Sequence, residues 1–177
     1  SVRVCVPGTT ANLGPGFDCL GLALDLWNTA TFTIEGEGLR LSCQGEGRDI
    51  PTDERNLVFQ AMRFYCDSRG CSFPRGLTIH CENQIPVGSG LGSSAAAVLM
   101  GILGASALME GSLDPQEALN LAARMEGHAD NAAAALLGGL VIVSSGKGNW
   151  LARQIQIPAL KVALVLPNVN LPTHAAR

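Results

Sequence analysis

The segment Pro86–Ala96 has the composition of a loop that binds an anion. Its glycines occupy three alternate positions, where they let the backbone approach a ligand closely. Two serines follow and begin an apolar run, and a helix formed by that run presents free N–H groups and a partial positive charge at its N-terminus. The serine hydroxyls add oxygens for phosphate or for Mg²⁺. The predicted phosphate-binding residues are Pro86, Val87, Gly88, Ser89, Gly90, Leu91, Gly92, Ser93, Ser94, Ala95 and Ala96.

Other glycine-rich motifs do not fit this segment. A Walker A loop needs lysine before its last Ser or Thr, and the segment has no lysine. The dinucleotide-binding fingerprint needs its third glycine one residue later than Gly92. The elbow that presents a nucleophilic serine needs a different spacing from Gly88-Ser89-Gly90. A plain flexible connection before a helix is the alternative, although such connections rarely combine three glycines, two hydroxyls and a long helix.

The loop is similar, at every fixed position, to the phosphate loop of the GHMP kinase superfamily, Pro-x-Gly-x-Gly-Leu-Gly-Ser-Ser-Ala. Three further segments resemble the homoserine kinases, one family of that superfamily: Pro7–Asp18, Glu126–Asn131 and Pro167–Arg177. Ala129 occupies a position where that family usually has proline, and the third segment matches at few positions. Relatives similar to mevalonate kinase have lysine where this chain has Thr9.

The resemblance implies a kinase that uses ATP and Mg²⁺ to phosphorylate the hydroxyl of L-homoserine, an early step of threonine biosynthesis. It implies that the loop binds ATP and that Asn56 faces the adenine, with a helix cap as an equal alternative for Asn56. It places Mg²⁺ on Ser94 and Glu126, and hard cations prefer such oxygen ligands. An exposed acid at a helix end is the alternative for Glu126.

The resemblance also implies a site for a zwitterion. Its substrate-binding residues are Asn12, Asp18, His128, Asp130, Asn131 and Arg177. Carboxylates and amides suit the ammonium group, and an arginine suits the carboxylate. Asp130 and Asn131 are the implied catalytic residues. Asp130 either binds substrate, with the γ-phosphate accepting the proton, or acts as a general base. A helix N-cap is a further role for Asp130, and packing is the alternative for His128.

Sequence periodicity and turn residues predict the elements that must position these groups. Strand Val2–Val6 is expected to run into an exposed, irregular loop, Pro7–Asp18. Strand Leu39–Cys43 is expected to pair with the strand before it, Leu20–Ile34. The other predicted strands are Gly76–Cys81, Leu140–Ser144, Leu151–Ile157 and Val162–Leu166, and the predicted helices are Asn56–Asp67, Ser93–Met109, one capped by Asp114 with a capping box to Glu117, and Ala132–Leu137.

Strands and helices mix without strict alternation, which favours an α+β fold. The resemblance implies a GHMP kinase N-terminal domain, similar to ribosomal protein S5 domain 2, with a mixed sheet packed against helices. It predicts an ATP-binding domain over residues 1–166 and, over 167–177, the start of a connection to a C-terminal domain. The function alternatives are another small-molecule kinase of the superfamily, or a nucleotide-binding fragment without activity of its own.

The composition indicates which binding partners and which cellular compartment to expect. The 177 residues are 47% hydrophobic and 15% charged, which is typical of a folded domain. A net charge of -3 without a basic run argues against nucleic acid. Six scattered cysteines without CxxC favour a reducing cytoplasm, with a disulfide in a secreted protein as the alternative. The apolar run Ala95–Met109 is too short to span a membrane and fits a buried helix. A homodimer is expected because the family often forms dimers.

Overall fold

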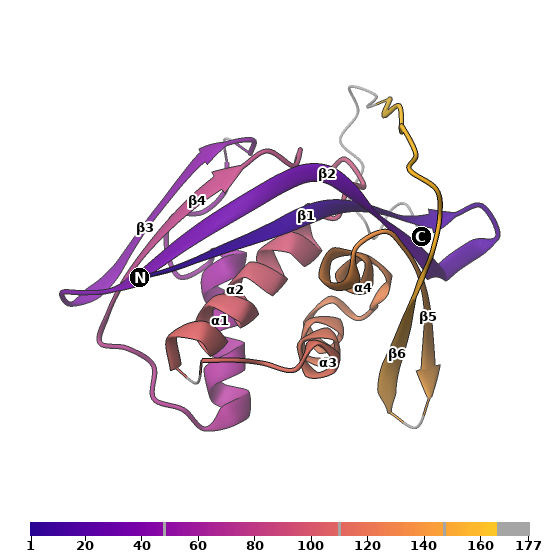
Figure 1. The fold of residues 1–177 in the computed structure, drawn as a ribbon. Helices are drawn as coiled ribbons and strands as arrows, with labels where there is room; N and C mark the ends of the chain where they lie inside the picture. The colour runs from indigo at the N-terminus through magenta and orange to yellow at the C-terminus, as the bar shows by residue number, and fades with distance from the viewer. Residues whose placement is uncertain (48, 110, 147, 166–177) are drawn as a thin grey trace.

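A mixed sheet lies over a layer of four helices in the computed structural model, which describes residues 1–47, 49–109, 111–146 and 148–165 (Figure 1). The strands are β1 (Val2–Leu13), β2 (Gly16–Ile34), β3 (Gly38–Gly45), β4 (Gly76–Asn83), β5 (Leu140–Gly146) and β6 (Asn149–Ile155). The helices are α1 (Leu57–Arg69), α2 (Ser93–Met109), α3 (Pro115–Glu126) and α4 (Asp130–Leu137).

The long strand β2 organises the sheet. It pairs with β1 along one edge, and its other edge pairs with β4 through Thr29–Ile34 and with β5 through Leu20–Leu22. All of these pairs are antiparallel, as is β5 with β6, whereas β3 runs parallel to β4. Because β1, β4 and β5 all bond to it, β2 fixes the positions of the segments that precede and follow the helices.

The prediction of an exposed loop at Pro7–Asp18 is wrong. The strand β1 continues to Leu13, a turn follows at Gly14 and Pro15, and β2 begins at Gly16. The backbone accommodates its proline and glycines because the pairing register shifts twice, between Pro7 and Thr9 and again between Ala11 and Leu13. Pro7, Gly8 and Thr9 are therefore buried residues of β1 rather than residues of an exposed loop.

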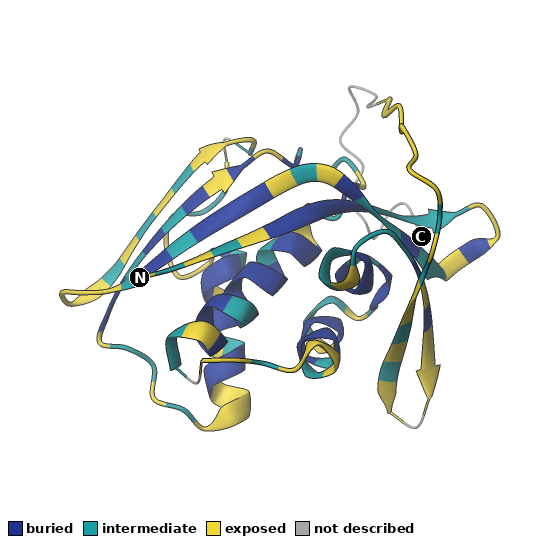
Figure 2. Ribbon diagram, viewed as in Figure 1, coloured by how far each residue is buried: buried dark blue, intermediate teal, exposed yellow. Residues whose placement is uncertain are grey.

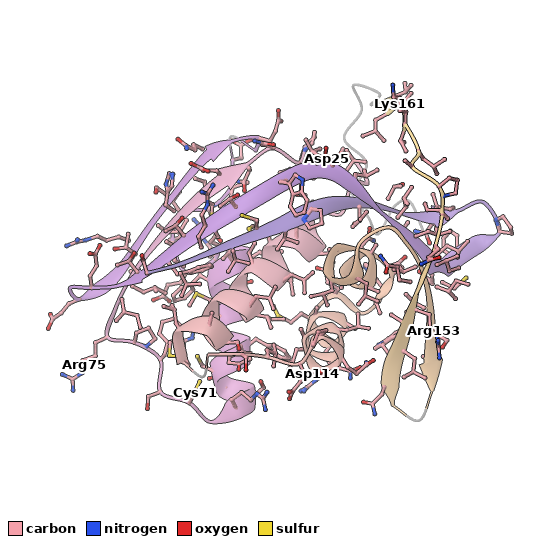
Figure 3. All side chains as sticks on the ribbon, in the orientation of Figure 1. Asp25, Cys71, Arg75, Asp114, Arg153 and Lys161 are labelled. Atoms are coloured by element: carbon pink, nitrogen blue, oxygen red, sulfur yellow. The ribbon has the colours of Figure 1, made fainter. Side chains whose placement is uncertain are left out.

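Two other strand predictions are also wrong. β3 does not pair with β2, because β4 lies between them. The side chains of Leu77 and Ile79 in β4 are almost fully buried, which suits an interior strand, whereas exposed residues alternate along β3 at the edge. Residues 162–165 form no strand and are exposed, and no described strand pairs with them. Lys161, in the same segment, extends away from the sheet in Figure 3.

The predicted helices are present, and side chains cap the N-termini of α1 and α3. Asn56 accepts the N–H of Val58 at the start of α1. Asp114, labelled in Figure 3, accepts the N–H of Glu117 at the start of α3. In the predicted capping box, the Glu117 carboxylate would bond back to the backbone N–H of Asp114. This carboxylate instead pairs with Arg69 at 2.7 Å.

The core lies between the sheet and α2, as the dark ribbon in Figure 2 shows. Most side chains of α2 are buried, which explains its apolar composition around the whole helix. None of the described helices is long and apolar enough to cross a membrane. Burial of α2 in the core therefore accounts for the apolar run at Ala95–Met109.

Candidate active site

The glycine-rich loop leads directly into α2. Gly88, Gly90 and Gly92 have φ values of 71°, 74° and 68°, which residues with a side chain rarely adopt. A Cβ atom added to Gly90 would meet nothing within 4 Å, so this part of the loop faces open space. The Gly92 carbonyl accepts the N–H of Ala96 at 2.9 Å and so begins the helix. The loop therefore presents exposed backbone beside a helix N-terminus, the arrangement that binds phosphate.

The residues before the loop are held by β2. The buried side chain of Asn28 accepts the N–H groups of Gln84 at 2.8 Å and Ile85 at 2.9 Å. These bonds satisfy two backbone donors where β4 ends. Within the loop, the Ser89 hydroxyl donates to the Pro86 carbonyl at 2.7 Å. Both contacts fix the path of the loop before it reaches α2.

Ser94 and Glu126 meet between the start of α2 and the end of α3. The Ser94 hydroxyl donates to the Glu126 carboxylate, which is only 10% exposed. Within the described part of the chain, no group of three or more His, Cys, Asp or Glu side chains could hold a metal ion. A magnesium ion bound by these two oxygens would therefore take its remaining ligands from a nucleotide or from water.

Asp130 is fully buried at the first residue of α4. One of its oxygens accepts the N–H of Asn131 at 2.9 Å and contacts His128 Nδ1 at 2.9 Å. His128 Nε2 lies 4.0 Å from the Glu126 carboxylate. The helix begins at Asp130 rather than at Ala132, so the alternative in which Asp130 caps the helix is wrong.

The N-terminus of α4 packs directly on β2. A Cβ atom at Gly21 would lie 2.5 Å from the Asp130 carbonyl, so only glycine permits this approach. The contact places the segment Glu126–Asn131 against the sheet. The acid and amide side chains of this segment thereby lie close to the glycine-rich loop.

Thr9 joins these parts. Its N–H donates to the Leu91 carbonyl in the loop at 3.0 Å. Its hydroxyl donates to Asn131 Oδ1 at 2.8 Å. The roles of Thr9 and Asn28 are not apparent from the sequence, because neither residue type nor spacing distinguishes a buried strand residue that supports a site from one that only packs.

Asn12 and Asp18 lie on either side of the β1–β2 turn. The Asp18 N–H donates to Asn12 Oδ1 at 2.9 Å, and both residues have positive φ values, 57° and 54°. Such conformations are uncommon outside glycine and often mark functional sites. The structure thus brings these two predicted substrate residues together, whereas Arg177 lies outside the described residues.

Asn56 occupies the cap position offered as one of its two roles. It is 2% exposed, and its amide donates to the Pro51 carbonyl at 2.7 Å and contacts Cys43 Sγ at 3.7 Å. A hydrogen bond from Cys81 lowers the pKa of Cys43 to about 7, helped by Asn56, although burial raises it. The contact with adenine stays a prediction.

Residues 56–139 match the family model of the GHMP kinases N terminal domain. A homoserine kinase of Caldicellulosiruptor bescii is 43% identical over 179 residues, which cover 99% of this chain and 57% of that relative. The chain therefore spans a little over half the length of this curated relative.

Solved structures share the fold. A Listeria monocytogenes protein, provisionally named a homoserine kinase, is 37% identical with a TM-score of 0.77, over 99% of this chain and 63% of that one. An L. major mevalonate kinase in complex with R-mevalonate is 19% identical with a TM-score of 0.67, over 88% of this chain and 52% of that one. The expected α+β architecture, a mixed sheet packed against helices, is confirmed.

Proposed function

We propose that the protein transfers the γ-phosphate of ATP to the hydroxyl of L-homoserine, because residues 56–139 match the GHMP kinases N terminal domain and nearly the whole chain is similar to homoserine kinases. The observation that carries this proposal is the meeting of the glycine-rich loop, the Ser94–Glu126 pair and the Asp130–Asn131 pair. The first two suit a nucleotide and its metal, and the third suits an acceptor.

Phosphoryl transfer depends on positioning and on neutralising charge more than on covalent chemistry. We propose that the N–H groups of residues 86–96 and the N-terminus of α2 bind the phosphates. Ser94 and Glu126 would hold Mg²⁺, which supplies positive charge to the phosphate oxygens. Their two oxygens already lie in contact, and this hard donor set fits the ion.

The acceptor is proposed to lie beside Asp130. The buried carboxylate of Asp130, oriented by Asn131 and His128, suits the ammonium group of an amino acid. Asn12 and Asp18 would add contacts from the β1–β2 turn, and Arg177 would bind the carboxylate. In this assignment the γ-phosphate accepts the hydroxyl proton, and a general base at Asp130 is the alternative.

An assay of ADP release tests the substrate. Turnover should appear with L-homoserine and not with mevalonate or shikimate. Activity on either of the latter, without activity on homoserine, would indicate another small-molecule kinase of the superfamily. We also propose a cytoplasmic enzyme of threonine biosynthesis that forms a homodimer, which light scattering of the purified protein would test.

The metal assignment predicts a strong effect of Glu126→Gln. Loss of the carboxylate should raise the Mg²⁺ concentration needed for half-maximal activity and lower kcat by about a hundredfold, or about 2.7 kcal/mol. Glu117→Gln, in the same helix α3 but paired with Arg69, is the matched control and should retain activity. Equal Mg²⁺ dependence in wild type and Glu126→Gln would exclude Glu126 as a ligand.

A second candidate function, nucleotide binding without catalysis, is favoured by the exposed backbone of the glycine-rich loop at the start of α2. The 177 residues would then bind a nucleotide without turning over. Calorimetry with a non-hydrolysable ATP analogue and Mg²⁺, alongside the ADP assay on the same chain, distinguishes the two. Binding without turnover supports the binding fragment, and turnover excludes it.

A further inference from the structure

Thr9 is a buried polar residue whose hydrogen bonds leave the sheet. It lies in β1 directly after the register shift at Pro7, and it is 0% exposed. A buried hydroxyl without a partner is costly, so its bond to Asn131 Oδ1 is part of what makes this position tolerable. The Thr9 hydroxyl therefore bonds to a residue of α4 rather than to a neighbouring strand of the sheet.

The same residue limits the glycine-rich loop. Its backbone N–H bonds to Leu91, and a Cβ atom at Gly92 would lie 2.0 Å from its hydroxyl oxygen and 3.2 Å from Asn131 Oδ1. Backbone of the loop thus passes directly over the Thr9–Asn131 hydrogen bond. Three segments, β1, the loop and α4, meet at one hydroxyl group.

The Thr9 hydroxyl and the Asp130 carboxylate together hold the orientation of the Asn131 amide. An amide has one oxygen that accepts and one nitrogen that donates. With Oδ1 bonded to Thr9, Nδ2 faces Asp130 Oδ1 at 3.4 Å, where the Asn131 backbone N–H also donates at 2.9 Å. The reversed amide would place an oxygen against the Asp130 carboxylate, which is repulsive.

We propose that Thr9 is a positioning residue for phosphotransfer: its hydroxyl orients the Asn131 amide, and through it the Asp130 carboxylate, while its backbone sets the distance from these groups to the glycine-rich loop. This rests on the proposed function, which places the acceptor at Asp130 and the phosphates at the loop. Thr9 touches neither the substrate nor the nucleotide in this proposal.

Four side chains at position 9 separate the hydroxyl from the methyl group. Thr and Ser have the hydroxyl, whereas Val and Ala lack it; Thr and Val have the branched methyl, whereas Ser and Ala lack it. We expect kcat to follow the hydroxyl, with Thr9→Val and Thr9→Ala about tenfold to a hundredfold below wild type and Thr9→Ser near it. KM for homoserine should change less than kcat. Thr10→Val, in the next position of β1, is the control and should keep wild-type kcat.

A structural role alone predicts another order. If Thr9 only packs, kcat will follow the melting temperature, and Thr9→Ser will lose as much activity as Thr9→Ala; that result would overturn the proposal. Should Thr9→Val fail to fold, the Ser and Ala pair still differs by one oxygen only. Thermal unfolding of all four proteins supplies the comparison.

A readout without turnover separates this proposal from the proposed function. The side-chain NH₂ signals of Asn131, assigned by their loss in Asn131→Asp, should be alike in Thr9 and Thr9→Ser and should shift in Thr9→Val and Thr9→Ala. Unchanged signals in all four would overturn the positioning role. If the signals shift in Thr9→Val and Thr9→Ala but the wild type does not phosphorylate homoserine, the positioning role of Thr9 stands. Only the proposed substrate is then refuted.

Discussion

At the scale of single residues, two glycines of the loop have the same conformation and different surroundings. A left-handed φ costs a residue with a side chain roughly 1–2 kcal/mol. Gly90→Ala should therefore lower the free energy of unfolding by about that amount, and its methyl group, which meets no protein atom, should weaken nucleotide binding by about tenfold or more.

Gly92→Ala should be worse for folding because its methyl group overlaps the Thr9 hydroxyl. Adding the cost of overpacking gives a loss of about 2–5 kcal/mol. Urea denaturation and calorimetry with MgADP measure the two effects separately. Equal stability of the two variants, or full nucleotide affinity in Gly90→Ala, would contradict the description of the loop.

The thiol of Cys43 gives a prediction about pH. Its pKa is lowered to about 7, chiefly by the hydrogen bond from Cys81, so its thiolate forms as the pH rises through about 7. Alkylation of Cys43 by iodoacetamide should show its half-maximal rate near this pH, whereas an unperturbed cysteine reaches it near 8.5. Peptide mass spectrometry across pH 5.5–9.5 (roughly the range that spans both pKa values) follows each cysteine separately.

Cys81→Ala provides the control for that profile. It removes the main cause of the lowered pKa, so the midpoint for Cys43 should move upward. A wild-type midpoint near 8.5, or one that does not move in Cys81→Ala, would show that the Cys43–Cys81 contact has no effect on the thiol.

At the scale of elements, the junction between β4 and the glycine-rich loop depends on Asn28. Asn28→Ala leaves the N–H groups of Gln84 and Ile85 without their acceptor, and the second is buried. The free energy of unfolding should fall by about 2–3 kcal/mol. Amide hydrogen exchange at these two positions should also become faster in the native state.

Gln44→Ala is the comparison for Asn28→Ala. Gln44 is exposed on the edge strand β3 and bonds only a surface carboxylate among its described partners. Its replacement should change stability by less than about 0.5 kcal/mol. An Asn28→Ala protein as stable as Gln44→Ala would mean that other groups satisfy the two amides.

Elements with local signals were predictable, and those that depend on distant partners were not. α2 begins at Ser93 and ends at Met109 as its apolar run predicts, and Asp114 caps α3 as its residue type predicts. The sequence did not show that β4 separates β3 from β2, because strand order depends on contacts between remote segments. Pro7 and Gly8 resembled loop residues because the register shift that accommodates them involves the partner strand.

The geometry of the candidate site was predictable in part. The family resemblance indicated the loop, Ser94, Glu126 and the Asp130–Asn131 pair, whose roles stay predictions, and the structure brings Ser94 to Glu126. It could not identify Thr9 or Asn28, whose importance comes from burial and from bonds to other segments. The bond from Val58 confirms the cap role of Asn56, and the contact of Asn56 with adenine stays a prediction.

At the scale of the whole molecule, the site draws on β1, the loop, α2, α3 and α4 together. Binding of MgADP should therefore stabilise the chain against global unfolding rather than order the loop alone. At a hundred times Kd the gain should be about 2.7 kcal/mol. Urea midpoints measured with and without MgADP test this, and hydrogen exchange should slow in β1 and α4 as well as in the loop. Protection confined to the loop would contradict a shared site.

The Thr9–Asn131 hydrogen bond joins residues that are 122 positions apart, which has a consequence for the newly made chain. A ribosome that adds about 5–20 residues per second needs roughly 6–24 seconds to pass from one to the other. During that interval the β1–β2 hairpin has left the ribosome, but its buried threonine has no α4 to bond. The phosphate loop likewise precedes Glu126. Under the proposed function, the complete site can therefore form only after Asn131 has left the ribosome, because the loop and Thr9 both precede their partners in α3 and α4.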